Sequence, residues 1–374
     1  PVNTHRLLQS ARAGGDYLVR MQRPDGSFVY SYRAALDTGS TARYNIVRHA
    51  GAAISLFDLY GATHDRRYLN AARKAVDFLH GRFHETVVAV PHSEAAYEAL
   101  GPNRSRTGLY VTDDDGKAKL GAMALSLLAE VDEIKYLGRR DLTQAEALAN
   151  VIMAMQNEDG SFRTTFNSGA NEPDDPPSLY FPGEAMLALT ELYQLIPRHD
   201  PRLLDTAERG AGFLIRAQRE QTDLPPDAWF AQSLEALYRI THKSEYARHA
   251  IALAVSMVKG QYSVGAPEGY EGGVTGGIPR AVQSASRAEG VLAGYRLAII
   301  LKDATSWTLL AGLKSSAGFQ LSQQFTSGSS FFLPAPERAL GGFRESFSST
   351  RIRIDYVQHN IESLLGLAAA LEEK

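Results

Sequence analysis

The 374-residue chain is dominated by segments with helical periodicity, and these segments come in two kinds that alternate. Segments of one kind are amphipathic, with charges on the outer face, and cover about 4–22, 65–82, 143–156, 201–218, 244–259 and 305–324. Segments of the other kind are apolar on all sides after their first turn, and cover about 43–60, 117–135, 182–195, 227–241, 286–302 and 355–372. A helix that is apolar on all sides has to be buried on all sides. Six outer-type helices, each followed by a buried one, predict six helical hairpins closed in a ring, an all-α (α/α)6 toroid.

A short repeat marks the ends of outer-type segments. "MQRPDGSF" (21–28) and "MQNEDGSF" (155–162) are near copies, and "AQREQTDL" (217–224) and "SQQFTSGSSFF" (322–332) look like weaker versions. The pattern predicts a helix end and a glycine-containing turn, with Phe28 or Phe162 folding back onto the ring. It resembles the Q-x-x-D-G-S-aromatic repeat of terpene-cyclase-type toroids, which implies the same architecture. β-type alternation is nearly absent and no linker interrupts the pattern, so we expect one domain over residues 1–374.

Composition and charge narrow the function class. The chain is 44% hydrophobic and 22% charged, with a net charge of −3 and no basic run, which argues against a nucleic-acid partner. No apolar run reaches the ~18 residues that a membrane span needs, so we expect a soluble protein without a membrane partner. The absence of cysteine excludes disulfides and thiolate metal sites. The chain begins at Pro1, so removal of a leader stays open, cytoplasm and periplasm are both compatible, and the oligomeric state is not predicted.

The main functional signal is the position of polar residues on the buried helices. If these helices run parallel in the ring, their six N-terminal ends meet at one mouth, and each helix is polar at that end and apolar afterwards. This coincidence predicts a deep polar pocket. Its candidate residues are Tyr44, Arg48, His49, Asp115, Tyr180, Glu184, Asp227, Trp229, Arg287, Glu289, Arg353, Asp355, Tyr356 and His359.

The candidates divide into catalytic and substrate-binding groups. General acid–base chemistry needs positioned carboxyl groups or imidazoles. Glu184 and Asp227 are the candidate acid and base carboxylates, and His49, Asp355 and Tyr356 are further catalytic candidates. The remaining residues are expected to hold the substrate or form its walls: Tyr44, Arg48, Asp115, Tyr180, Trp229, Arg287, Glu289, Arg353 and His359.

Each candidate also has a structural interpretation. Asp115 and Asp227 fit helix N-caps or first-turn acids, and Glu184 fits the third position of a helix that starts with a proline. The aromatic residues also fit the core. A buried arginine needs paired acceptors, so Arg48 is expected in a network with a carboxylate of the fifth or sixth buried helix, whether catalytic or structural.

Metal and phosphate chemistry are not indicated, and no cofactor is expected. There is no H-E-x-x-H motif, and His80, His84 and His92 lie near an outer-helix end, where a chance surface group fits better than a zinc site. The "DDDG" run at 113–116 lacks the calcium-loop pattern. It is also not the D-x-D-D acid of terpene cyclases, because Thr112 stands at its first position. The glycines at 272–277 fit a rim loop, since no strand precedes them.

A toroid with acids and aromatic rings around one mouth resembles carbohydrate-active enzymes, among them glycoside hydrolases, polysaccharide lyases and sugar epimerases. "RIDYVQHNIESLL" (353–365) resembles the R-x-D-Y-x-x-H-x-x-x-x-L-L segment of glucuronyl C5-epimerases. That resemblance implies a uronate-binding site containing Arg353, Asp355, Tyr356 and His359, with the tyrosine among the groups that exchange a proton with the sugar. The β-rich domains that accompany those epimerases are missing from this chain. The arginine and histidine at the mouth also resemble sugar 2-epimerases.

These observations predict an enzyme that acts on an oligosaccharide or polysaccharide by general acid–base chemistry. Four arginines near helix N-termini favour an anionic ligand, hence an acidic saccharide. Among the possible reactions, glycoside hydrolysis is slightly favoured over uronate C5-epimerisation, sugar epimerisation or elimination. A non-catalytic glycan-binding toroid is an alternative from another class, and an isoprenoid cyclase is disfavoured because the D-x-D-D acid is absent.

Overall fold

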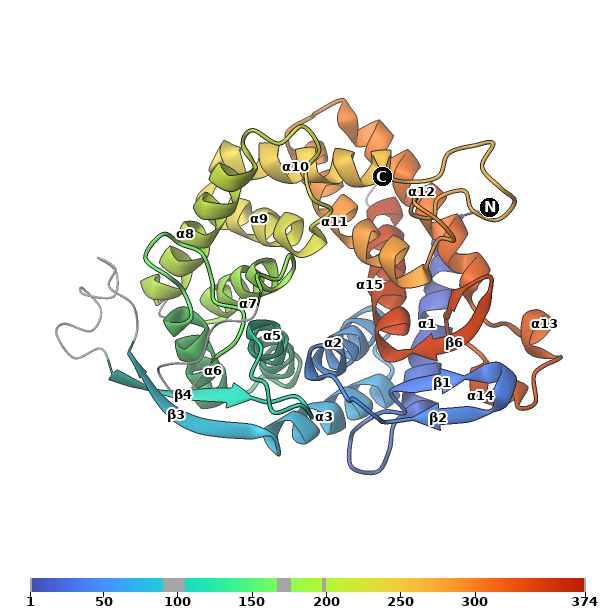
Figure 1. Cartoon of the computed structure of the whole chain (residues 1–374), viewed down its shortest axis with the longest axis horizontal. Coiled ribbons are helices and arrows are strands. Elements are labelled where there is room, and N and C mark those ends of the chain that lie inside the picture. Colours follow the sequence, from blue (N-terminus) through green and yellow to red (C-terminus); the bar gives the residue numbers. More distant parts are fainter. Residues whose placement is uncertain (1, 90–104, 167–175, 197–199, 373–374) are drawn as a thin grey trace.

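The computed structural model describes residues 2–89, 105–166, 176–196 and 200–372. Six helices form an inner ring (Figure 1): α2 (Ile46–Thr63), α5 (Leu120–Leu137), α7 (Phe181–Leu195), α9 (Ala228–Thr241), α11 (Ala281–Ile300) and α15 (Ile354–Glu372). Each inner helix packs against the next, and α15 packs against α2, which closes the ring. The predicted all-α (α/α)6 toroid is confirmed.

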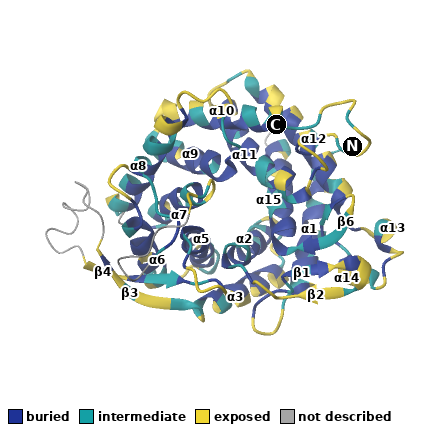
Figure 2. Ribbon diagram, in the orientation of Figure 1, coloured by how far each residue is buried: buried dark blue, intermediate teal, exposed yellow. Residues whose placement is uncertain are grey.

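Six outer helices surround this ring: α1 (Thr4–Met21), α3 (Arg66–His80), α6 (Thr143–Ala154), α8 (Pro201–Gln218), α10 (Ser244–Lys259) and α12 (Thr305–Gln323). Buried residues concentrate on the inner helices and on the inward faces of the outer ones (Figure 2). No described helix is long and apolar enough to cross a bilayer.

The outer and inner helices do not pair in the predicted order, in which each outer helix packs against the inner helix that follows it. Most outer helices pack mainly against the inner helix that precedes them, and the sixth pair joins the two chain ends, α1 against α15. The described inner-to-outer connections are short, and four of them turn through left-handed residues: His64, Gly138, His242 and Lys302. The outer-to-inner connections are long and lie at the N-terminal ends of the inner helices. Long loops therefore surround one mouth of the ring, the end where such folds carry binding residues.

These long loops contain short strands that the sequence did not indicate. One antiparallel sheet has the order β2–β1–β6–β5, from β1 (Ser31–Arg33), β2 (Thr38–Ser40), β5 (Arg344–Ser346) and β6 (Ser349–Arg353). A second pair joins β3 (Phe83–Ala89) and β4 (Ser105–Val111). Strand β6 runs directly into α15 and pairs with β1, so it fixes the start of α15 to the N-terminal loops. Three further short helices, η1 (Ala34–Leu36), α13 (Ser327–Ser330) and α14 (Pro336–Ala339), lie in the same loop regions.

The repeated turn is confirmed at both near copies. Gln22 and Gln156 each donate their side-chain amide to the glycine of the turn and to an outer helix, and each forms a bridge with the aromatic residue that follows. The weaker versions lie elsewhere. Gln324 forms its β-bridge with Phe343 rather than with the exposed aromatic pair at 331–332. A similar bridge follows α10, at Gln261, and does not lie within 217–224 as predicted.

Candidate active site

A pocket of about 410 Å³ lies at the mouth formed by the N-terminal ends of the inner helices. All six inner helices, or the residues just before them, contribute to its lining. We call it the mouth pocket. Its lining includes seven residues that the sequence predicted: Arg48, Tyr180, Glu184, Trp229, Arg353, Asp355 and His359.

Glu184 lies in the first turn of α7, two residues after Pro182; because the helix starts at Phe181, Glu184 is its fourth residue rather than the third as predicted. Its side chain packs over Gly121 of α5, where an added Cβ atom would lie 2.4 Å from Glu184 Oε2. Glu184 is 3% exposed, and Oε2 has no hydrogen-bond partner in the described structure. Burial, with a smaller contribution from Asp227, raises the pKa of Glu184 to about 8. The carboxyl group therefore keeps its proton at neutral pH and can act as a general acid.

Asp227 is the N-cap of α9 and accepts a hydrogen bond from the Phe230 amide at 3.0 Å. It is 1% exposed and lies outside the lining of the mouth pocket. Burial raises its pKa to about 7, and its charge in turn raises that of Glu184. Asp227 therefore has the structural role that the sequence also allowed, that of a helix N-cap. Asp227 acts on the site through Glu184 rather than by reaching the pocket.

Asp355 is held between two arginines. Its Oδ1 accepts from Arg353 Nε at 2.5 Å and its Oδ2 from Arg353 Nη2 at 2.7 Å, and Arg48 Nε lies 3.1 Å from the same Oδ2. Arg48 also donates to the Tyr30 hydroxyl. A bidentate arginine–carboxylate pair has a fixed geometry, so this network holds both guanidinium groups at the pocket wall. The expected partner of Arg48 is therefore the carboxylate of α15.

His359 faces the mouth pocket from α15, opposite α7 in the ring. Its Nδ1 lies 2.9 Å from Glu289 Oε1, while Nε2 has no hydrogen-bond partner in the described structure. Burial opposes protonation of His359, but the Glu289 carboxylate outweighs it, so the pKa of His359 lies above its usual value. The Trp229 ring stands edge-on to the imidazole at a centroid distance of 6.4 Å. A histidine oriented by a carboxylate, with its second nitrogen free, is the arrangement of a general base.

Two predicted residues of α2 and its N-terminal flank lie in the core instead. His49 is fully buried and bridges the Tyr44 hydroxyl, 2.7 Å from Nδ1, and the Ala75 carbonyl, 2.8 Å from Nε2. Tyr44 in turn accepts from the Phe28 amide in the repeated turn. Burial lowers the pKa of His49 to about 4, so its ring is neutral. Both residues connect the first outer helices to α2, and we leave them out of the proposed site.

Three more candidates lie outside the pocket lining. The Tyr356 ring lies under Arg353, 4.6 Å from its guanidinium carbon, and the Tyr356 hydroxyl accepts from Arg351. Arg287 extends toward Gly260 at the end of α10. Asp115 is largely exposed and accepts from the Lys117 amide in the loop. The aspartate that turns inward is Asp113, which the sequence could not distinguish from its two neighbours.

The two described histidines near the outer-helix end have different partners. His80 bonds to Glu130 of α5, and His84 lies on β3 beside Tyr110. His92 lies outside the described residues. The interpretation of a chance surface group therefore fails for His80, which is partly buried against α5.

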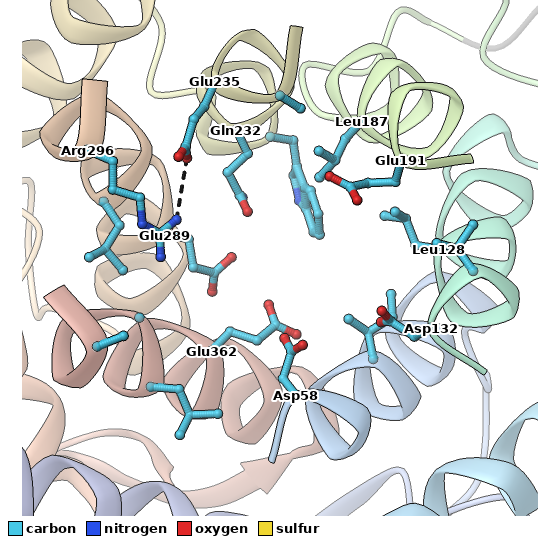
Figure 3. A pocket seen from close by; sticks show the side chains of 18 of the residues that line it. Asp58, Leu128, Asp132, Leu187, Glu191, Gln232, Glu235, Glu289, Arg296 and Glu362 are labelled. Atoms are coloured by element: carbon cyan, nitrogen blue, oxygen red, sulfur yellow. Dashed lines mark hydrogen bonds and ion pairs between the residues drawn. The ribbon is translucent and has the colours of Figure 1, made fainter. Parts of the chain in front are cut away.

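A second cavity, of about 570 Å³, continues the lumen between the C-terminal halves of the inner helices. Trp229 lines both cavities, and Glu289 connects them by its bond to His359. Figure 3 shows carboxylates pointing into this space from several helices. We call it the acidic chamber; its acids are Asp58, Asp132, Glu191, Glu235, Glu289 and Glu362.

The sequence analysis missed this chamber because it treated the rest of each buried helix as apolar. The available signal was a single acid inside each apolar run, such as Asp58 in "SLFDLY" or Glu191 in "ALTELY". Enclosure in the lumen raises the pKa of Asp58 to about 6 and that of Glu362 well above its usual range. Each acid is isolated in the sequence, so the cluster can be recognised only after the closed ring has placed these side chains around one cavity.

No family model matches the chain, and no match was found among curated proteins. Solved structures do match over nearly the whole length. An unsaturated glucuronyl hydrolase specific for heparin aligns with a TM-score of 0.67 at 12% identity, covering 99% of this chain and 98% of the other. A cellobiose 2-epimerase from Bacillus thermoamylovorans gives 0.66 at 12% identity, with 97% and 99% covered. A GH76 α-mannanase of Bacteroides thetaiotaomicron gives 0.64 at 10% identity, with 98% and 96% covered.

At such low identity these similarities establish the fold. The expected resemblance to α/α-toroid carbohydrate-active enzymes is confirmed at that level. The neighbours include glycoside hydrolases and sugar epimerases, so the shared ring supports more than one reaction.

Proposed function

We propose that this chain is a carbohydrate-active enzyme that binds a saccharide in the mouth pocket and transforms it by general acid–base chemistry. One observation carries the proposal: a protonated buried carboxyl group, Glu184, and a carboxylate-oriented imidazole, His359, line one pocket from opposite helices. Burial raises the pKa of Glu184 to about 8, so this group holds a proton to donate, and the unbonded Nε2 of His359, when deprotonated, can accept one. The carbohydrate-active neighbours of the same fold support the substrate class.

The pocket walls fit an acidic sugar. Trp229 and Tyr180 offer aromatic faces, on which sugar rings stack. Arg48 and Arg353 add positive charge, and the surrounding inner-helix N-termini favour anions. Asp355 neutralises part of this charge while it holds the two guanidinium groups in place. We therefore propose a saccharide that carries a carboxylate near the Arg48–Arg353 wall.

Glycoside hydrolysis is the first candidate reaction. Glu184 donates its proton to the glycosidic oxygen as the bond to the anomeric carbon breaks. His359 Nε2 removes a proton from the attacking water, and Glu289 stabilises the imidazolium that forms. The sequence had assigned the second role to Asp227, but that side chain serves α9 as its N-cap.

Epimerisation is the second candidate, and the His359–Glu289 pair favours it. An imidazole on one side of a sugar and an acid on the other can remove a proton from a carbon beside a carbonyl and return one to the opposite face. Tyr356 has no part in this scheme, because its hydroxyl is bonded to Arg351 outside the pocket lining.

The test is a screen of uronic-acid and neutral oligosaccharides in D2O, with products followed by NMR. New reducing ends indicate hydrolysis, deuterium at carbon without cleavage indicates epimerisation, and an unsaturated product indicates elimination. Glu184→Gln and His359→Gln should abolish turnover while saccharide binding persists, and Asp115→Asn is the matched control that should leave turnover intact. Binding without turnover in the unmodified protein would instead identify a glycan-binding toroid. Neither binding nor turnover with any substrate would refute the proposal.

A further inference from the structure

The acidic chamber contains a cluster of metal-ligand type that the proposed reaction does not use in full. One oxygen of Glu289, one oxygen of Glu362 and one imidazole nitrogen of His359 all lie within 4.8 Å of one another. His359 and Glu362 are three residues apart and share a face of α15, while Glu289 comes from the neighbouring α11. Figure 3 shows the Glu289, Glu362 and Asp58 carboxylates directed toward the middle of the chamber.

The charges lining this chamber do not balance. Glu235 is paired with Arg239 at 2.6 Å and with Arg296 at 3.4 Å. Lys135 is the only other cation among the described lining residues, and it faces the five remaining carboxylates. The C-terminal ends of all six inner helices surround the same space, and helix C-termini also favour positive charge. The chamber therefore holds more acidic side chains than the described basic side chains can pair with.

An unpaired atom gives independent evidence for a ligand. Glu289 is 5% exposed, and its Oε1 accepts from His359, but its Oε2 has no hydrogen-bond partner in the described structure. A buried carboxylate oxygen without a donor is costly, and native structures rarely leave one unsatisfied. Glu289, whose second oxygen is unpaired, belongs to the three-residue cluster with His359 and Glu362.

The geometry points to a divalent metal ion bound in the acidic chamber by Glu289, His359 and Glu362. One imidazole nitrogen and two carboxylates, with no thiolate in the chain, form a ligand set that suits Zn²⁺ or Mn²⁺. The 570 Å³ chamber leaves room for water at the remaining coordination positions. The sequence analysis names Glu289 and His359 as substrate-binding candidates but does not join them as metal ligands, because 70 residues separate them.

The site has a consequence for catalysis that rests on the proposed function. Nδ1 is the imidazole atom beside Glu289, so the ion takes the Nδ1 lone pair and the Nδ1 proton leaves to solvent. A neutral imidazole then carries its proton on Nε2, the nitrogen without a hydrogen-bond partner in the described structure. His359 can donate a hydrogen bond in this state but cannot accept a proton. A bound divalent ion should therefore inhibit the acid–base reaction, and chelation should restore it.

The test is a calorimetric titration of chelator-treated, untagged full-length protein with ZnCl2. Glu362→Gln removes one ligand outside the proposed catalytic pair and should weaken Zn²⁺ binding by roughly tenfold or more. The matched control is Glu130→Gln, which disrupts the other His/carboxylate group among the described residues, His80–Glu130–Glu133, and should leave the lumen site intact. Equal affinities for the unmodified protein and Glu362→Gln would overturn the inference.

A second measurement needs no variant. In ¹⁵N-labelled unmodified protein, long-range imidazole correlations should show that Zn²⁺ replaces the proton on Nδ1 of His359, which leaves to solvent, while Nε2 is protonated. A change confined to His80, or none, would overturn the inference. Both measurements are made without substrate. Turnover lost in Glu184→Gln together with absent Zn²⁺ binding would therefore leave the proposed function standing and reject only the metal site.

Discussion

His49 and His359 lie near the starts of two inner helices that pack side by side, yet they have opposite roles in the structure. His49 has both ring nitrogens bonded within the protein and no exposure. His359 has one nitrogen bonded to Glu289 and the other free at the mouth pocket. From the sequence the two histidines could not be distinguished, because each lies near the start of a buried helix. The rotation of each helix about its axis decided which imidazole faces the lumen.

His49 should make stability depend on pH. Its pKa is about 4 in the folded protein and near 6.5 when unfolded, so below pH 6.5 the unfolded chain binds a proton that the folded chain does not. The free energy of unfolding should thus fall as pH decreases from 6.5 toward 4, by about 2 kcal/mol at pH 5 from this group. Urea denaturation at pH 7 and pH 5 measures the change. His49→Gln should lose this part of the pH dependence; an unchanged slope would contradict the assignment.

Glu184 should control both turnover and stability. Its pKa of about 8 means that activity needing the protonated carboxyl should decline as pH rises through 8. Glu184→Gln should lower kcat by about 10²-fold or more, since a general acid contributes on that scale. Steady-state kinetics between pH 5 and pH 9 test both points. A Gln variant with full activity, or a profile without a loss near pH 8, would remove Glu184 from the mechanism.

The same substitution should stabilise the fold. Between the unfolded pKa, near 4.5, and about 8 the unfolded chain releases a proton that folded Glu184 keeps, so the free energy of unfolding falls as pH rises through this range. At pH 7 the cost of keeping Glu184 buried is about 3 kcal/mol, and glutamine removes it. Thermal unfolding at pH 7 should therefore give a higher Tm for Glu184→Gln than for the unmodified protein. A lower Tm would mean that the carboxyl group is stabilised by contacts rather than held at a cost.

At the level of helices and loops, a single buried side chain from a loop at the mouth can hold two inner helices together by hydrogen bonds. Asp113 accepts from the Ile46 amide at 2.6 Å and from Lys119 Nζ at 2.6 Å, so it caps α2 and joins it to the residue that precedes α5. The sequence predicted that acids collect at helix starts. It could not identify which of three consecutive aspartates turns inward, because that depends on the path of the loop after β4.

Asp113→Ala should therefore be much more damaging than Asp115→Ala. The first variant leaves the Ile46 amide without its acceptor and leaves Lys119 with only its 3.4 Å contact to Asp115, at a cost of about 1–3 kcal/mol. The second removes an exposed side chain and should stay within about 0.5 kcal/mol. Chemical denaturation of both variants gives the comparison. Equal losses would show that the cap contributes little to the junction of α2 and α5.

On the scale of the whole molecule, the ring closes through the two chain ends. Outer α1 packs on α15, and Gly14 allows this approach, since a Cβ atom there would lie 3.0 Å from Ile361 Cγ1. The hydrophobic pattern predicted both helices but not their pairing. Contact between residues more than 300 positions apart depends on closure of the ring.

Gly14→Leu should overpack this junction and lower the free energy of unfolding by about 1–3 kcal/mol or more. Gly318→Ala is the matched control: this exposed glycine of α12 has nothing within 4 Å of an added Cβ, so alanine should stabilise the helix by up to about 1 kcal/mol. Denaturation midpoints compare the two. A neutral Gly14→Leu would indicate that the chain ends are loosely packed.

The sequence by itself determined the alternation of outer and inner helices, because periodicity and burial are properties of each segment alone. It also determined that polar residues cluster at inner-helix starts, since helix N-termini accept acids and capping groups wherever they lie. Only the tertiary structure decided that Glu184 and His359 face one pocket while His49 and Tyr44 do not. Only it gathered single acids from separate helices into the acidic chamber. The physical reason is that these relations depend on helix rotation and ring closure, which arise from contacts between segments far apart in the chain.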